Sequence, residues 1–478
     1  MDLPARPGTL PRMSPNARSP ESDRPTTPAE LKKELEARQI KHVKVGGFDV
    51  DGVLRGKYIS VEKFFSVLEG GFGFCDVIFG WDMHDALYDS ATDARAVTGW
   101  HTGYPDTIAV IDPSTYRRLP WEPDTAAFLA DFRLKDGSDH PACPRSLLRR
   151  VIKRLGDRGM HAKVACEFEF FLFKETPASI REKRYAGMTP LTPGMFGYSW
   201  LREGQNSELV HAILDDMKAF DIEIEALHTE TGPGVYEVAI RYDDALAAAD
   251  KAALFKTACK QTCARFGVIP TFMAKWSADL PGSSGHLHQS LWSAKEQNVL
   301  FDEKGEGSLS PLAHHYLGGL VSLMPALTAI HSPTINAYKR YVPGVWAPLT
   351  ASWGHENRTS AIRIIAGGAK STRIEYRQTA ADINPYTSIA ACLAAGLYGI
   401  DQKIAPPPAV SGDASEGDLA RLPRTLAEAT DLLDGSKPAR EILGDAFVDH
   451  YVRTRRHEVA RFNRAVTDWE LARYFEII

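Results

Sequence analysis

A strongly β-prone run at residues 163–173 constrains the fold more than any other feature of the sequence. Side chains of a strand point alternately to its two faces, so Glu167 and Glu169 share one face while Phe168 and Phe170 share the other. Further apolar residues follow this alternation, which favours a strand buried on both sides. Buried neighbouring carboxylates require a cation or a shared proton. The run therefore predicts a sheet that carries a cation site, with a plain solvated strand face as the alternative.

A second acidic pair lies downstream, where Glu230 and Glu237 flank the sequence Thr-Gly-Pro-Gly at residues 231–234. Glycines tolerate backbone conformations that turn the chain sharply, so the two carboxylates can converge. This pair indicates a site only in combination with the first pair.

Two histidines share a strand face in another alternating run, at residues 285–292. The same face carries a hydroxyl and an indole, and its four residues are His286, His288, Ser290 and Trp292. A single strand histidine is usually a satisfied core residue, whereas two at this spacing favour a site with several ligands.

Basic residues concentrate in the last third of the chain. Residues 373–377 alternate so that Arg373, Glu375 and Arg377 share a face, a pattern that also fits a plain salt-bridge row. More basic residues gather just upstream: Lys339, Arg340, Arg358 and Arg363. The whole chain has a net charge of −5, so this local concentration indicates an anionic ligand, because guanidinium groups match carboxylate and phosphate.

The donor types fit a divalent cation and a phosphate-bearing substrate. Several carboxylates with one imidazole suit Mg²⁺ or Mn²⁺ better than a structural zinc ion. No Walker A motif is present, so a nucleotide would be bound mainly through metals and side chains. These features together favour phosphoryl transfer to an acidic acceptor.

Composition argues against other functional classes. A chain with 56 basic and 61 acidic residues lacks the charge of a nucleic-acid binder, so no nucleic-acid partner is expected. The longest small and apolar run, residues 388–400, is too short for a bilayer, so no membrane association is expected. The six cysteines lack metal-site spacing, which fits a reduced cytoplasm.

The pattern of elements predicts an α+β protein with two domains. Residues 1–28 read as a disordered tail, residues 29–138 as a small N-terminal β-rich domain, and residues 139–478 as a large α/β domain. Thr27 with Glu30 forms a capping-box pattern for a first helix, and Asp51-Gly52 joins a predicted hairpin. Later helices are predicted at residues 146–155, 207–220, 245–266, 311–330, 385–400 and 440–467.

The ordered motifs resemble the glutamine synthetase superfamily, bacterial type I branch, over about residues 40–400. The shared pattern runs from a Glu-x-Glu strand and a second Glu pair to a His-x-His-x-Ser strand. It continues with Asn-x-Tyr-Lys-Arg-x-Val-Pro-Gly at residues 336–344, Asn-Arg-x-Ser-x-Ile-Arg at residues 357–363, and Arg-x-Glu-x-Arg at residues 373–377. The resemblance implies an N-terminal β-grasp-like domain, a glutamine synthetase catalytic domain, and a double hexameric ring, a homo-dodecamer.

The resemblance also assigns roles to the matching residues. One metal ion would be held by Glu169, Glu230 and Glu237, and another by Glu167, His286 and Glu375. ATP would meet His288, Ser290, Trp292, Lys370 and Arg373. L-glutamate would bind Gly282, Arg340 and Arg377, while Arg358 and Arg363 would face the transferring phosphoryl group.

Two departures from the family pattern concern the attacking nitrogen. Ammonia-using members carry a Glu two residues past Pro-Gly, where this sequence has Trp346. The N-terminal Asp of the ammonium site has no clean copy, and Asp76, Asp82 and the catalytic Glu230 are the candidate proton acceptors. These departures favour ligation of glutamate to a small organic amine, with Trp346 in the amine pocket. The alternatives are a glutamine synthetase that uses ammonia and a non-catalytic relative, which would lack metal ligands.

Overall fold

The computed structural model describes residues 25, 27–88, 96–416 and 419–478. Most of the predicted tail, residues 1–28, lies outside the described residues. Its last residue belongs to α1 (Pro28–Ala37), and Thr27 caps that helix through the predicted capping box with Glu30.

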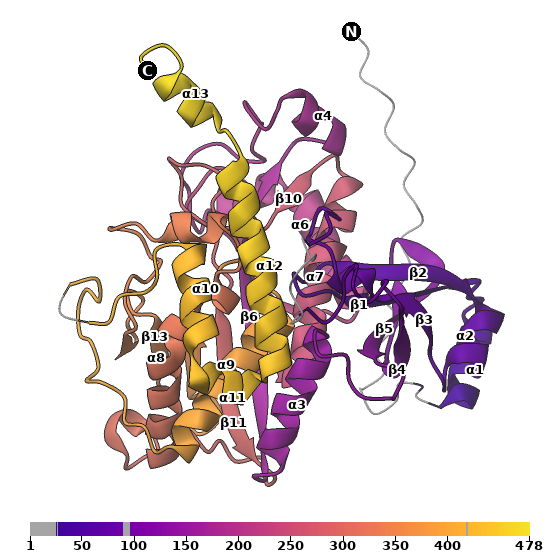
Figure 1. Ribbon diagram of the computed structural model, residues 1–478, viewed down its shortest axis with the longest axis horizontal. Coiled ribbons are helices and arrows are strands. Elements are labelled where there is room, and N and C mark those ends of the chain that lie inside the picture. The colour runs from indigo at the N-terminus through magenta and orange to yellow at the C-terminus, as the bar shows by residue number, and fades with distance from the viewer. Residues whose placement is uncertain (1–24, 26, 89–95, 417–418) are drawn as a thin grey trace.

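The first sheet forms a small N-terminal domain (Figure 1). Its strand order is β2-β1-β5-β4-β3, from the strands β1 (His42–Phe48), β2 (Leu54–Ser60), β3 (Phe72–Cys75), β4 (Asp106–Leu119) and β5 (Glu122–Arg133). The helix α2 (Val61–Val67) and the short helix η2 (Asp76–Phe79) connect them. The predicted hairpin is confirmed: β1 and β2 pair antiparallel, and Gly52 at the turn has a φ of 79°.

The second sheet forms the centre of the large domain. Its main strand order is β12-β13-β14-β11-β6-β8-β7, with β9 and β10 also paired to β6. The strands are β6 (Met160–Phe173), β7 (Ile224–Thr229), β8 (Val235–Ile240), β9 (Asp243–Asp244), β10 (Ile269–Thr271), β11 (Leu287–Ser293), β12 (Trp353–His355), β13 (Ile362–Ile365) and β14 (Arg373–Tyr376). The predicted strand at residues 163–173 is thus confirmed as part of β6, which pairs with β8 and β11.

Helices surround this sheet, and four of them begin at the predicted residues 207, 245, 311 and 385. They are α3 (Pro144–Gly156), α4 (Pro177–Glu182), α5 (Trp200–Gln205), α6 (Ser207–Ala219), α7 (Ala245–Ala264), η3 (Glu306–Ser308), α8 (Pro311–His331), η4 (Asn336–Arg340), α9 (Pro385–Asp401), α10 (Leu426–Gly435), α11 (Lys437–Leu443), α12 (Asp445–Arg464) and α13 (Asp468–Tyr474). None of the helices in the described part of the chain is long and apolar enough to span a bilayer.

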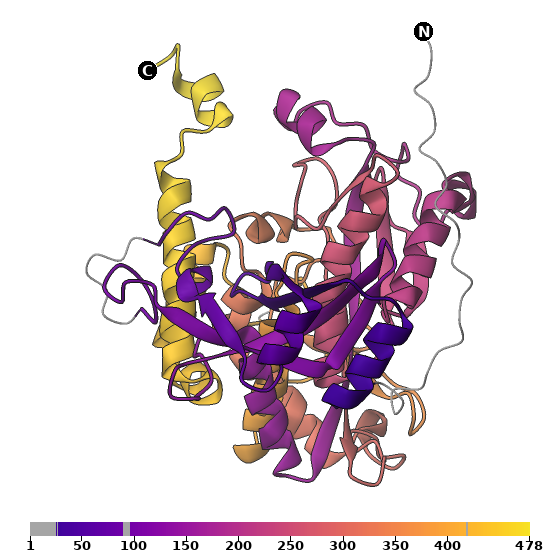
Figure 2. The same ribbon diagram turned by 90° about the vertical axis from the view of Figure 1, so that its right-hand side faces the viewer.

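The prediction of one helix over residues 440–467 is wrong. The chain forms the separate helices α11 and α12, because Gly444 between them adopts a φ of 92° that a helix cannot contain. A further break follows α12, and α13 projects from the body in both views (Figures 1 and 2).

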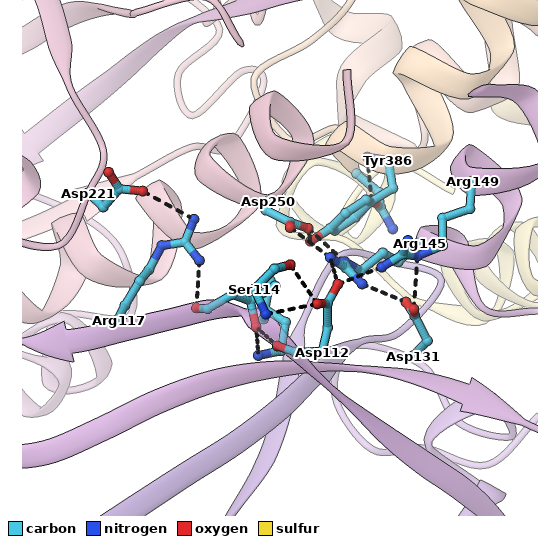
Figure 3. Close-up of polar contacts among 12 residues, drawn as sticks. Asp112, Ser114, Arg117, Asp131, Arg145, Arg149, Asp221, Asp250 and Tyr386 are labelled. Carbon is cyan, nitrogen blue, oxygen red and sulfur yellow. Dashed lines mark hydrogen bonds and ion pairs between the residues drawn. The ribbon is translucent and has the colours of Figure 1, made fainter. Parts of the chain in front are cut away.

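A buried arginine joins the two domains. The guanidinium of Arg145 in α3 lies 2.8 Å from Asp112 of β4 and 3.0 Å from Asp131 of β5. It also lies 2.8 Å from Asp250 of α7, whose carboxylate accepts a hydrogen bond from Tyr386 of α9 (Figure 3). One side chain thus bridges the first sheet and two helices of the large domain.

The expected α+β architecture, a small N-terminal β domain and a large α/β domain, is confirmed. The proposed boundary, between residues 138 and 139, lies in the loop between β5 and α3.

Candidate active site

Four central strands bring the predicted carboxylates and histidines into one region. Strand β6 lies between β8 and β11, and β14 is the next neighbour of β11. Across these pairs Glu169 lies opposite Glu237, and His288 lies opposite Glu375. Sheet register, rather than nearness in sequence, therefore assembles these side chains.

The first acidic group comprises Glu167, His286 and Glu375. Their ligand atoms all lie within 4.8 Å of one another. Nδ1 of His286 is 3.5 Å from a carboxylate oxygen of Glu167 and 3.5 Å from one of Glu375. Two carboxylates and an imidazole are a donor set that fits Mg²⁺ or Mn²⁺.

Both carboxylates of this group favour the charged form. Burial acts to raise the pKa of Glu167, but the charges and hydrogen bonds of His288 and His286 outweigh it and hold that pKa well below its usual range. Burial likewise opposes ionisation of Glu375, and His286 and Arg377 outweigh it, so the pKa of Glu375 is also lowered. The group is therefore anionic at neutral pH, as a cation site requires.

The second acidic group contains a residue that sequence reasoning missed. Glu230 and Glu237 gather around His228, with nitrogen–oxygen distances of 3.9 Å and 3.4 Å respectively. The ring of Tyr198 stacks on His228 with 4.4 Å between ring centroids. His228 stands two residues before Glu230 at the end of β7, so strand alternation was a signal that could have found it.

Glu169 lies between these groups on β6. Its carboxylate accepts a 2.6 Å hydrogen bond from the backbone amide of Ser284. Burial raises the pKa of Glu169, and the negative charge of Glu237 adds to this effect. A divalent cation held by both carboxylates would reverse the shift, because it favours their charged forms.

The predicted nucleotide residues line a single cavity of about 280 Å³. The cavity is bounded by all five of them, His288, Ser290, Trp292, Lys370 and Arg373. Glu167 also lines it, so the cavity adjoins the first acidic group. The indole of Trp292 donates a 2.9 Å hydrogen bond to Ser290, and the ammonium of Lys163 lies 4.6 Å from the centre of its ring, which fixes an aromatic wall.

A buried guanidinium marks the predicted glutamate position. Arg340 is only 2% exposed and donates to Ser284 Oγ at 3.0 Å, and it forms no ion pair with any carboxylate among residues 25, 27–88, 96–416 and 419–478. A Cβ atom on Gly282 would lie 2.6 Å from the side chain of Arg340, so only glycine leaves room here. Its charge acts on the carboxylates of Glu169 and Asp382, but neither forms an ion pair with it. A buried guanidinium without a close ion pair favours an anionic ligand.

Two of the remaining arginines, Arg363 and Arg377, contact the first acidic group. Arg363 lies 3.1 Å from a carboxylate oxygen of Glu375, and Arg377 pairs with the other oxygen. The Nε of Arg377 donates to the backbone carbonyl of Arg358 at 3.2 Å, while the Arg358 side chain is exposed. Arg363 and Arg377 thus stand beside the same carboxylate, one at each oxygen.

The contacts described for the predicted amine-pocket residue and for the N-terminal proton-acceptor candidates do not join them to these groups. Trp346 is 69% exposed on the loop after η4. Asp82 accepts from two backbone amides of its own turn and lies 3.6 Å from His457 of α12. Asp76 is buried in the N-terminal domain beside Thr98. The contacts described for these three residues include none with either acidic group.

Comparison with known proteins identifies relatives across most of the chain. Residues 141–474 match the family model described as "Glutamine synthetase, catalytic domain". The chain is 47% identical to "Type-1 glutamine synthetase 2" of Dictyostelium discoideum, over 91% of this chain and 84% of that protein. It is 38% identical to "Glutamate--isopropylamine ligase" of Pseudomonas sp, over 93% and 97%. Among solved structures, "GmaS/ADP complex-Conformation 1" matches with a TM-score of 0.82 and 29% identity, over 94% of this chain and 99% of that one.

Proposed function

Because this chain belongs to the glutamine synthetase family and is an ATP-dependent glutamate ligase of that family, we propose that its nucleophile is an organic primary amine. The product would be a γ-glutamyl amide, formed through γ-glutamyl phosphate. The expected setting is the cytoplasm.

The residues of the site divide into three proposed roles. The two acidic groups with Glu169 would hold two divalent cations, Mg²⁺ or Mn²⁺, which supply charge neutralisation for ATP when bound. The cavity lined by Trp292 and Arg373 would hold the nucleotide, in line with the ADP named for the related GmaS structure. Arg340, Gly282 and Arg377 would hold L-glutamate.

The proposed reaction has two steps. An oxygen of the glutamate γ-carboxylate attacks the γ-phosphorus of ATP, ADP leaves, and Arg358 and Arg363 stabilise the charge on the transferring group. The amine nitrogen then attacks the acyl carbon, inorganic phosphate leaves, and a carboxylate accepts the N–H proton. Glu230 is the proposed acceptor within this chain, with Asp76 and Asp82 as the other candidates.

Trp346 is the observation that carries the choice of an amine over ammonia. An ammonium site needs carboxylates that replace its water and accept a proton, and an indole can do neither. An indole can instead bury the apolar part of an amine, at about 0.8 kcal/mol per CH₂ group. The relative named glutamate–isopropylamine ligase supports this choice, and the relative named type-1 glutamine synthetase favours the alternative, ammonia.

A direct comparison of nucleophiles tests the proposal. Glutamate-dependent ADP release is measured with ammonium and with a panel of alkyl, hydroxyalkyl and aryl amines, and mass spectrometry identifies each amide. We expect at least one amine to exceed ammonium by about tenfold in kcat/KM, which equals about 1.4 kcal/mol. If ammonium is the best nucleophile, the enzyme is a glutamine synthetase instead.

Two substitutions of Trp346 test whether its aromatic side chain, and not a general effect on folding, sets the preference for the amine. Trp346→Glu should narrow or reverse the preference for the amine while leaving the glutamate KM nearly unchanged. Trp346→Phe, the matched control, keeps an apolar aromatic wall and should retain the preference.

We also propose assembly into a double hexameric ring. Trp346 is exposed, and the contacts described for Asp76 and Asp82 include none with the acidic groups, which fits an amine site completed by a neighbouring subunit. This arrangement is the one that the family resemblance implies.

A further inference from the structure

A second cavity lies at the seam between the N-terminal domain and α7. Its volume is about 270 Å³. One wall is the face of the first sheet that carries Leu54, Ala127 and Leu129, and the other includes Leu254 and Ala258 of α7. No residue of the two acidic groups, of the nucleotide cavity or of the predicted glutamate site lines it.

Small residues at facing positions create the hollow. Gly46 of β1 lies directly opposite Gly56 of β2, so neither strand sends a side chain into the space at this register. Ala127 of β5 and Ala258 of α7 add only methyl groups to the walls. Interiors are normally packed with few voids larger than a water molecule, so a space of this size is suited to a ligand.

The lining is chemically amphipathic. Apart from its aliphatic walls, the cavity is lined by Trp121 and Phe220, and the apolar surface predominates. The lining carries three cationic residues, Lys44, Lys57 and Arg117, and of these Arg117 is the buried one, at 5% exposure. A fixed positive charge at the edge of an apolar space is a recognition element for an anion.

The contacts of Arg117 hold its guanidinium at the edge of the cavity. Its Nη1 donates to the backbone carbonyl of Thr115 at 2.9 Å. Its Nη2 lies 3.7 Å from a carboxylate oxygen of Asp221 (Figure 3).

We propose that this seam cavity binds a small amphipathic carboxylate, with its anionic group at Arg117 and its hydrocarbon part between the first sheet and α7. An engineered apolar cavity of about 150 Å³ accommodates benzene, so about 270 Å³ suits a molecule of roughly ten non-hydrogen atoms. Medium-chain and phenylalkyl carboxylates have this size and polarity. Because such a ligand contacts both domains, it would stabilise their packing against each other.

Calorimetric titration of the full-length protein with octanoate, without ATP or glutamate, tests the proposal independently of the ligase reaction. We expect one octanoate per chain, at least tenfold weaker binding of octanol and octylamine, and a rise in Tm with octanoate. Undetectable octanoate binding, or equal binding of all three probes, would overturn the proposal.

Two variants locate the bound molecule. Arg117→Gln should weaken octanoate at least tenfold and leave octanol unchanged, whereas Arg118→Gln, a control at a neighbouring residue outside the lining, should bind octanoate like the wild type. Ala258→Phe should fill the cavity and abolish binding of both probes. Retained ADP binding verifies that each variant is folded. If Ala258→Phe does not fold, the contrast between Arg117→Gln and Arg118→Gln decides, and equal octanoate affinity in those two variants contradicts the proposal.

Discussion

At the scale of single residues, Arg340 is deeply buried and forms no ion pair with a carboxylate in the described part of the chain. A charge-assisted hydrogen bond to a substrate carboxylate contributes about 1.5–3 kcal/mol. We therefore expect Arg340→Ala to raise the KM for glutamate by roughly 10- to 150-fold while ADP affinity changes little. Steady-state kinetics and ADP titration measure the two effects.

Arg373→Ala is the contrasting variant, since Arg373 lines the nucleotide cavity. It should weaken ADP binding more than glutamate use. If Arg340→Ala instead loses nucleotide affinity and keeps the wild-type glutamate KM, then Arg340 binds the nucleotide and not glutamate.

Two buried histidines make stability depend on pH. Burial lowers the pKa of His331 and of His450 to about 3, and neither ring nitrogen of either residue has a hydrogen-bond partner within the described chain. The unfolded chain binds protons near pH 6.5 and the folded chain does not, so stability is full above about pH 6.5 and falls as the pH decreases toward 3. At about pH 5 each histidine should lower the free energy of unfolding by about 2 kcal/mol.

Denaturation at about pH 7 and about pH 5 checks this expectation. His331→Phe keeps an aromatic ring beside Tyr376 and should reduce the pH-dependent loss of unfolding free energy by about 2 kcal/mol. The exposed His211→Phe is the control and should keep the wild-type pH dependence. Equal pH dependence in wild type and His331→Phe would show that His331 does not titrate as argued.

At the scale of elements, the packing of α8 against α9 depends on glycine. A Cβ atom on Gly396 of α9 would lie 2.0 Å from the ring of Tyr316 in α8, and both residues are buried. Closely packed core side chains have little room to shift away from an added methyl group. Gly396→Ala should therefore destabilise the protein by about 1–3 kcal/mol despite the higher helix propensity of alanine.

A matched substitution isolates this steric effect. A Cβ atom on Gly204 in α5 would meet no other atom within 4 Å, so Gly204→Ala should be neutral or stabilising by up to about 1 kcal/mol. Thermal unfolding of both variants measures the contrast. A Tm for Gly396→Ala at or above that of Gly204→Ala would mean that α8 and α9 separate easily.

At the scale of the whole molecule, the C-terminal segment is strongly apolar and uncovered in a single chain. Trp469 is 61% exposed, Phe475 81% and Ile478 94%, and α13 projects beyond α12 (Figure 2). Exposed apolar side chains in this number are typical of an interface, and the proposed ring supplies a second copy of the chain as the partner.

Removal of residues 465–478 should therefore reduce the assembled mass in analytical ultracentrifugation while leaving the fold of each chain intact by circular dichroism. Full-length protein at the same concentration is the reference. An unchanged sedimentation coefficient, beyond the lost mass, would place the interface elsewhere.

The sequence by itself determined the local elements and the types of chemical groups. Strand alternation in β6 placed Glu167 and Glu169 on one face, and the capping box at Thr27 fixed the start of α1. These features depend on backbone geometry over a few residues, so periodicity and cap residues are sufficient to predict them. The same local analysis wrongly predicted one continuous helix through Gly444. A helical sequence pattern does not reveal whether a glycine within it will adopt a positive φ.

Only the tertiary structure decided which distant groups meet. The pairing of β7 with β8 places His228 beside Glu237, and packing of α3 between the domains places Arg145 among three aspartates. The facing glycines of β1 and β2 likewise become a cavity wall only when α7 closes over them. Such contacts depend on strand register and on the packing of elements far apart in the chain, neither of which local periodicity specifies.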